Sequence, residues 1–332
     1  MSRSRLAVLV STIVVALGVL AGLGALWLNP ARAAVGPMPG GALILPADAR
    51  FVMGFDMKRF TASPFYARYA TERGMEPEAL RELEEKTGLN PARDVEQIVV
   101  AGTPGPGQVG LVLVTGRFDL YKLGRTLETE HKARGYNHAG ATLYAFKEEG
   151  PDAVALAFLD ETALLFGRRD RVEAATASRT KGETPLKKNA ALLGLVEKVR
   201  PGSTFWMVGD QSLLASLPTS VPAPGASADG ASVNLPALKS VTVTGDLDPQ
   251  VSLAVTGEAA DEAAARNLAD VVRGFVALVS LQAQQKPELK QLASAVSVAT
   301  EQNRVLVSAR IPYEMIDALK GKAKAGTPDP VK

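Results

Sequence analysis

Hydrophobic residues follow two different patterns along this 332-residue chain. Residues 6–28 form an uncharged run after Arg3 and Arg5, and a helix of that length crosses the roughly 30 Å hydrocarbon core of a bilayer. The basic residues favour a cytoplasmic N-terminus, which would place the rest of the chain on the other side of the membrane. Ala31-Arg32-Ala33 offers an alternative, a secretory signal cleaved after Ala33, which also leads out of the cytoplasm.

Beyond residue 41 the pattern changes to short alternating runs typical of half-buried strands, separated by apolar residues at helical spacing. One helical stripe comprises Leu120, Leu123, Leu127 and His131, and another comprises Val272, Phe275, Val276 and Val279. Hairpin-linked strands with helices between them predict an antiparallel-rich α+β fold after one N-terminal transmembrane helix or signal segment.

Proline and polar residues mark several helix starts. Ser63-Pro64, Glu76-Pro77 and Asn90-Pro91 each place a proline where the first helical turn tolerates it. Asp170 followed by Glu173 resembles a capping box. These patterns predict helices that begin near residues 64, 77, 91 and 170.

Segments that recur in the same order in both halves indicate an internal duplication. The matched pairs are 46–55 with 201–210, 99–102 and 112–116 with 241–245 and 253–257, and 141–158 with 293–311. The number of residues between the two members of a matched pair is smaller for the middle pair than for the first and last pairs. We therefore expect the second half to lack a helix of the first.

The predicted organisation follows from these patterns. It comprises an anchor or signal over 1–28, a flexible tether over 29–41, α+β repeats over 42–199 and 200–320, and a disordered tail over 321–332. Within the second repeat, residues 218–234 are rich in Pro, Ala, Ser and Gly, which predicts a disordered loop. Two such repeats can form one sheet or two lobes, and the sequence favours neither.

Composition narrows the classes of function. The 37 basic residues nearly balance the 35 acidic ones, which argues against binding to nucleic acid. The chain contains no cysteine, so disulfides, thiol catalysis and cysteine-ligated metals are excluded. A hydrophobic share of 46% is ordinary for a globular body.

Leu45-Pro46-Ala47-Asp48, then Thr87-Gly88-Leu89-Asn90-Pro91 and Asp94 before an apolar run, lie in the first third of the chain. They resemble a family of bacterial membrane-anchored proteins of unknown function whose extracytoplasmic part starts Leu-Pro-Ala-Asp before a strand. The resemblance implies an extracytoplasmic location and a two-repeat α+β fold. It implies no activity.

Several short motifs resemble sequences that carry chemistry in other proteins. Residues 105–110 match G-x-G-x-x-G, but Leu-Val-Leu-Val-Thr follows, which predicts a hairpin turn rather than a dinucleotide site. Ser178 and Lys181 match S-x-x-K without partner motifs, so a capped helix end is the favoured interpretation. His131 and His138 would need carboxylates such as Glu128 or Glu130 to hold a metal.

Six carboxylates are candidates for the acid–base pair that glycosidases require. Most of them fall in predicted turns or at strand ends. They are Asp48, Asp56, Glu148, Glu149, Asp160 and Glu161. No pair stands out. We therefore predict no catalytic, cofactor-binding or metal-ligating residue.

One basic segment is a candidate for contact with an anionic polymer or lipid headgroups. Its basic residues are Arg168, Arg169, Arg171, Arg179, Lys181, Lys187 and Lys188. A solvated helix face is the alternative interpretation.

Together these features predict a non-catalytic binding or scaffold protein at the bacterial inner membrane, with its folded part in the periplasm. If the chain is cleaved after Ala33, the body is released into the periplasm. The expected contacts are the membrane through residues 6–28 and a protein or lipid partner. Alternatives are a carrier or sensor for an apolar ligand, held beside the apolar helix at 271–281, and a divergent hydrolase.

Overall fold

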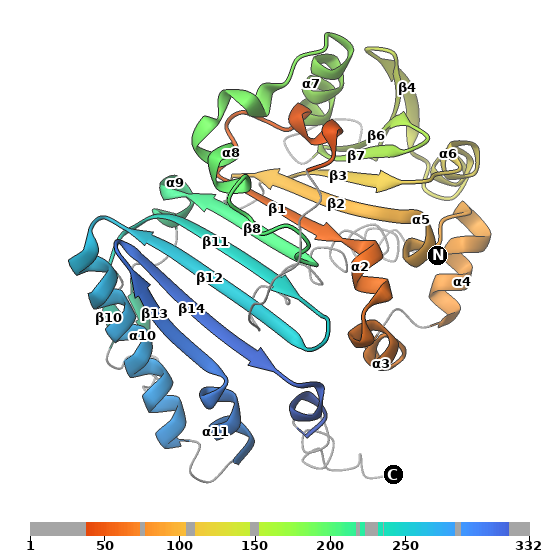
Figure 1. Ribbon diagram of the computed structural model, residues 1–332. Coiled ribbons are helices and arrows are strands. Elements are labelled where there is room, and N and C mark those ends of the chain that lie inside the picture. Colours follow the sequence, from red (N-terminus) through yellow and green to blue (C-terminus); the bar gives the residue numbers. More distant parts are fainter. Residues whose placement is uncertain are drawn as a thin grey trace.

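Twelve strands form one antiparallel sheet in the computed structural model, which describes residues 38–73, 77–103, 110–146, 153–216, 220–222, 232–234, 236–282 and 287–318 (Figure 1). The N-terminal half supplies β1 (Phe51–Asp56), β2 (Val95–Gly102), β3 (Leu111–Gly116), β4 (Arg134–His138), β5 (Ala141–Ala145), β6 (Val154–Asp160) and β7 (Ala163–Arg168). The C-terminal half supplies β8 (Phe205–Asp210), β11 (Leu238–Asp246), β12 (Val251–Ala259), β13 (Val296–Glu301) and β14 (Arg304–Ile311).

Across the sheet the strands are ordered β13-β14-β12-β11-β8-β1-β2-β3-β7-β6-β5-β4. The two halves therefore share one sheet, and β1 and β8 meet at their junction. This arrangement confirms the predicted α+β class with a large antiparallel sheet. Within the described ranges no helix has the length and apolar character needed to cross a membrane, and the expected anchor at 6–28 lies outside those ranges.

Helices cover both faces of the sheet. One face packs against η1 (Gly40–Ile44), α7 (Arg169–Thr180), η2 (Pro185–Lys188) and α8 (Ala190–Val196). The other face packs against α6 (Leu120–Thr129) in the first half and α10 (Glu262–Gln282) in the second. Phe55, Phe205, Leu253 and Val305 lie on the same face of the sheet, as the register of the paired strands shows. Because Phe55 clusters with residues of α6 and Val305 with residues of α10, the two helices cover the same side.

Other helices connect the strands. Between β1 and β2 the chain forms α2 (Met57–Ala62), α3 (Pro64–Arg73), α4 (Pro77–Thr87) and α5 (Pro91–Asp94). The second half has α9 (Gln211–Leu214) after β8 and α11 (Pro287–Ser294) after α10. The three helix starts predicted at proline are thus confirmed, and the Asn90 side chain caps α5 by accepting a bond from the Ala92 amide at 3.2 Å.

The capping box predicted at Asp170 is wrong. Helix α7 begins at Arg169, and its N-cap residue Arg168 makes no side-chain cap bond. Asp170 instead pairs with Arg168, and Glu173 accepts a bond from Arg169 at 2.9 Å. The neighbouring arginines engage both carboxylates that a capping box would need.

Corresponding residue pairs occur in the two halves. Phe51 lies opposite Gly102 in the β1–β2 ladder, and Phe205 lies opposite Gly245 in the β8–β11 ladder. Asp56 and Asp210 each end a strand and cap the helix that follows. These equivalences correct the matching of 46–55 with 201–210 by one residue, because Phe51 corresponds to Phe205 rather than to Trp206.

The third matched segment also needs correction. The hairpin β13–β14 lies beside β12, and the hairpin in the same place beside β3 is β6–β7 rather than β5–β6. Both equivalent hairpins turn over two residues, between Asp160 and Ala163 and between Glu301 and Arg304. Residues 141–158 were therefore matched to the wrong pair of alternating strands.

The second half is shorter between its first two main strands, as the sequence predicts. In place of the four helices α2 to α5 it has α9 and a short ladder of β9 (Ser220–Pro222) with β10 (Ser232–Asn234). These two strands lie inside the stretch 218–234 that was predicted to be a disordered loop. The prediction does not hold for the described residues of that stretch.

A second contact joins the halves beyond the sheet. The Tyr69 hydroxyl of α3 lies 2.8 Å from an Asp317 carboxylate oxygen and 3.1 Å from the Tyr313 carbonyl oxygen. Within the second half, the Tyr313 hydroxyl donates to the Leu247 carbonyl. Arg68 pairs with Asp317. Burial raises the pKa of Tyr313 to about 12, so its hydroxyl stays protonated as a donor.

The junction itself rests on a close contact between a glycine and a tryptophan. Gly54 of β1 lies opposite Trp206 of β8, and a Cβ at residue 54 would lie 2.4 Å from Cε2 of the indole. Trp206 is buried. We therefore expect Gly54→Ala to lower the free energy of unfolding by about 1–3 kcal/mol, because overpacking moves a buried ring. Urea unfolding of the full-length protein measures this loss.

Gly194 in α8 provides the control, since a Cβ there meets no atom within 4 Å. Gly194→Ala should leave stability unchanged or raise it by up to about 1 kcal/mol, because alanine is the better helix former. Equal effects of the two substitutions would contradict the account of the junction.

Candidate functional site

A polar hollow lies where the apolar covering of the sheet ends. Across β1, β2, β3 and β7 one row of paired, buried residues comprises Gly54, Val99, Leu113 and Leu165. The next row on the same face lies two residues away on each strand, toward the end of β1, and comprises Asp56, Gln97, Thr115 and Ala163. Side chains on one face of a strand recur every second residue, so this change in residue type produces a polar floor.

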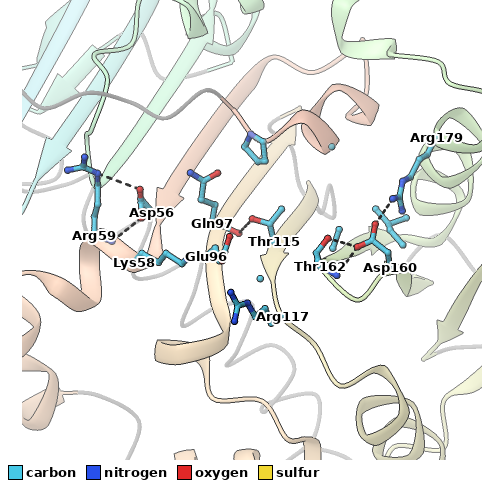
Figure 2. A pocket seen from close by; sticks show the side chains of 15 residues that line it. Asp56, Lys58, Arg59, Glu96, Gln97, Thr115, Arg117, Asp160, Thr162 and Arg179 are labelled. Atoms are coloured by element: carbon cyan, nitrogen blue, oxygen red, sulfur yellow. Dashed lines mark hydrogen bonds and ion pairs between the residues drawn. The ribbon is translucent and has the colours of Figure 1, made fainter.

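The hollow has a volume of about 630 Å³ and is open to solvent (Figure 2). Pro39 and Gly41 of the N-terminal segment line one side of it, and the β6–β7 turn lines another. Its lining includes four basic residues, Lys58, Arg59, Arg117 and Arg179, and three acidic ones, Asp56, Glu96 and Asp160. The lining therefore has one more basic than acidic group.

Most of these charges are paired with each other. Asp56 accepts a bond from the Arg59 amide at 2.9 Å as the cap of α2, and its carboxylate lies 3.6 Å from the Arg59 guanidinium. Lys58 pairs with Glu96, and Arg179 pairs with Asp160. The acidic groups of the hollow are thus held by neighbouring cations.

Asp160 is held most firmly. The Thr162 hydroxyl and amide donate to the same carboxylate oxygen at 2.6 and 2.7 Å, and Arg179 binds the other oxygen. Burial acts to raise the pKa of Asp160, but the bonds from Thr162 and Arg179 outweigh it and lower that pKa. Asp160 is therefore a carboxylate near neutral pH.

Arg117 differs from the other cations of the hollow. It is exposed, and its guanidinium has no hydrogen-bond or ion-pair partner among the described residues. In Figure 2 it stands between the Lys58–Glu96 pair and the Asp160 turn. The hollow thus offers one free guanidinium beside the hydroxyl of Thr115 and the amide of Gln97.

The predicted basic segment is largely neutralised within the protein. Arg171 forms a two-bond pair with Asp48 at 2.8 and 2.7 Å, which lowers the pKa of that carboxyl. Arg168 and Arg169 pair with the α7 carboxylates Asp170 and Glu173, respectively, and Arg179 reaches the hollow. Three exposed lysines complete the segment, Lys181, Lys187 and Lys188. Contact between this segment and an anionic surface stays a prediction.

Other motifs fall outside the hollow. The Ser178 hydroxyl lies 3.3 Å from a Glu183 carboxylate oxygen, and Lys181 is the C-cap of α7, as the interpretation as a capped helix end predicts. Nδ1 of His131 is buried without a partner among the described residues, and burial lowers the pKa of this histidine. In the described part of the chain, no three His, Asp or Glu side chains form a group suited to a metal.

Two motifs involve residues that the structure does not describe. Residues 105–109 and the pair Glu148 and Glu149 lie outside the described ranges. Residue 110 is followed by β3, which pairs with β2, so the predicted hairpin is confirmed.

The motifs in the sequence do not point to Lys58, Glu96, Gln97 or Arg117 of the hollow. The only sequence feature that indicates these residues is the change from apolar to polar residues at strand ends.

Comparisons with known proteins add a distant likeness. Neither family models nor curated proteins match the chain. Among solved structures it is similar to TP0453 in crystal form III, with a TM-score of 0.46, 10% identity and coverage of 88% of this chain and 100% of that one. Crystal form I of TP0453 has a TM-score of 0.45 and 8% identity, with 86% and 98% covered.

The Asp160 contacts predict a pH-dependent contribution to stability. A carboxyl whose pKa is lowered on folding stabilises the protein above its unfolded value of about 3.9, and this contribution is lost as the pH falls through the folded value. Asp160→Asn should lower the free energy of unfolding at pH 7, by less than about 1 kcal/mol because the pair is partly exposed. Urea unfolding at pH 7 and pH 3 should show the deficit shrinking at pH 3.

The neighbouring exposed Glu161 supplies the control, because its side chain has no ion-pair partner in the described structure. Glu161→Gln should leave stability unchanged at both values of pH. A deficit for Asp160→Asn that is as large at pH 3 as at pH 7 would contradict the ionic account.

Proposed function

We propose that the chain is an extracytoplasmic binding protein of a bacterial inner membrane, anchored by residues 6–28, and that it binds a small polar ligand with an anionic group. The polar hollow is the proposed binding place. The observation that carries this proposal is the free guanidinium of Arg117 among charges that are otherwise paired.

The lining suits recognition of an anion. A guanidinium presents a planar fork of donors that matches carboxylate and phosphate oxygens. The neighbouring ion pairs hold the acidic groups, so an incoming anion meets an excess of one positive charge. The Gln97 amide and the Thr115 hydroxyl would supply neutral hydrogen bonds to the rest of the ligand.

The same lining supports binding rather than catalysis. An efficient general acid or base has a pKa near the working pH. Asp160 is moved away from that range by Thr162 and Arg179. Asp56 is engaged as a helix cap. These groups serve better as fixed contacts than as proton carriers.

The position of the hollow fits the proposed anchor. Met38 and Pro39 lie beside Asp56 and Gln97, so the chain reaches the body next to the hollow. Nine residues, 29–37, separate this point from the proposed span, and they extend at most about 30 Å. The ligand would therefore be bound close to the membrane surface.

We also propose that the two halves are related repeats. The polar row at the strand ends recurs in the second half as Asp210, Ser240, Glu258 and Arg304. Together with the repeated Phe–Gly pairs and aspartate caps, this row supports duplication of one unit.

Calorimetry on the purified full-length protein tests the binding proposal. The ligands are a panel of small carboxylates, sugar acids and phosphate esters. We expect at least one to bind, and Arg117→Gln to weaken that binding at least tenfold, because the charged contact is lost.

Arg134→Gln is the matched control, since Arg134 is an exposed arginine in β4 outside the hollow. It should leave the affinity unchanged. Equal loss in both variants, or no binding across the panel, would overturn the proposal.

A further inference from the structure

Helix α10 changes character along its exposed side. In its first half the exposed charges are paired with one another, Glu262 with Arg266 and Asp270 with Arg273. After Arg273 no charge occurs through Gln282. Among the residues of this stretch whose side chains are described, the exposed ones are Gly274, Ala277, Leu278 and Leu281, which we call the α10 stripe.

The α10 stripe is not part of the packing against the sheet. Ala265, Leu268 and Ala269 are buried with Val305 of β14 on the inner side of the helix. Leu278 is 41% exposed and Leu281 is 60% exposed, and the one other large hydrophobic residue as exposed in the described structure is Tyr121. Figure 1 shows the end of α10 beside α11, at the β13 edge of the molecule.

Spacing makes the stripe continuous. Residues three and four apart lie on one side of a helix, and positions 274, 277, 278 and 281 follow that spacing. Most surface helices direct their apolar residues inward and their polar residues outward. The second half of α10 is apolar on its outer side as well, so an apolar medium suits that side better than water does.

We propose that the α10 stripe inserts shallowly into the lipid bilayer beside which the protein is held. This inference rests on the proposed anchoring through residues 6–28. Two exposed leucines bind a membrane weakly by themselves. A tether that keeps the helix near the bilayer makes such contacts effective, as weak membrane signals act in combination.

A bilayer fits the stripe better than a protein partner does. A stable protein interface buries roughly 1,200–2,000 Å² in total, which four residues on one helix do not supply. Arg273 is paired with Asp270, and after the stripe the sequence carries Lys286 and Lys290 against Glu288. Basic residues that follow an apolar stripe in the sequence favour a surface of anionic headgroups.

The cysteine-free chain permits a direct test by single-cysteine labelling. Leu278→Cys, labelled with an environment-sensitive fluorophore, is reconstituted as full-length protein in vesicles of phosphatidylethanolamine and phosphatidylglycerol that contain spin-labelled lipid. Ala263→Cys is the matched control, because Ala263 is exposed in the charged half of the same helix. We expect the label at residue 278 to be quenched at least twofold more than the label at residue 263.

Adding Leu281→Glu to the Leu278→Cys protein should abolish the difference, because a charge in the stripe opposes insertion. Equal quenching at residues 278 and 263, or quenching that persists with Glu at residue 281, would overturn the proposal. Alkaline extraction of the same vesicles reports the anchor separately. If the protein is extracted but the label at residue 278 is quenched, only the proposed anchoring through residues 6–28 is contradicted. If the protein is retained but the label is not quenched, only the proposed insertion of the α10 stripe is contradicted.

Discussion

The antiparallel pairing of β1 with β8 is the contact on which the rest of the structure depends. The pairs run from Phe51–Gly209 to Phe55–Phe205, and they join seven strands of one half to five of the other. The indole of Trp206 packs where Gly54 has no side chain. Because this ladder is central, the placement of one half relative to the other is set by main-chain hydrogen bonds rather than by a flexible linker.

The candidate site follows from the end of the same strand. β1 leaves the sheet at Asp56, which caps α2 and thereby brings Lys58 and Arg59 to the edge of the hollow. The adjacent strands turn polar at the same level, so the floor of the hollow continues across the sheet. The junction that unites the halves therefore also positions the charges proposed to bind the ligand.

Local patterns in the sequence predicted much of the fold, but register and long-range contacts escaped them. Helix starts at Pro64, Pro77 and Pro91 were predictable because proline acts within one turn. Alternating hairpins look alike along the chain, so β5–β6 was mistaken for β6–β7 as the equivalent of β13–β14. The hollow escaped motif reasoning because its residues come from several turns that only the folded sheet brings together.

Amide hydrogen exchange of the full-length protein tests the central claim most directly, namely that β1 and β8 unite both halves in one cooperative sheet. Main-chain amides bonded in a central ladder exchange only when the whole unit opens. The account predicts that peptides from β1 and β8 exchange as slowly as those from β3 and β12. Rapid exchange in β1 and β8 while β3 and β12 stay protected would contradict it.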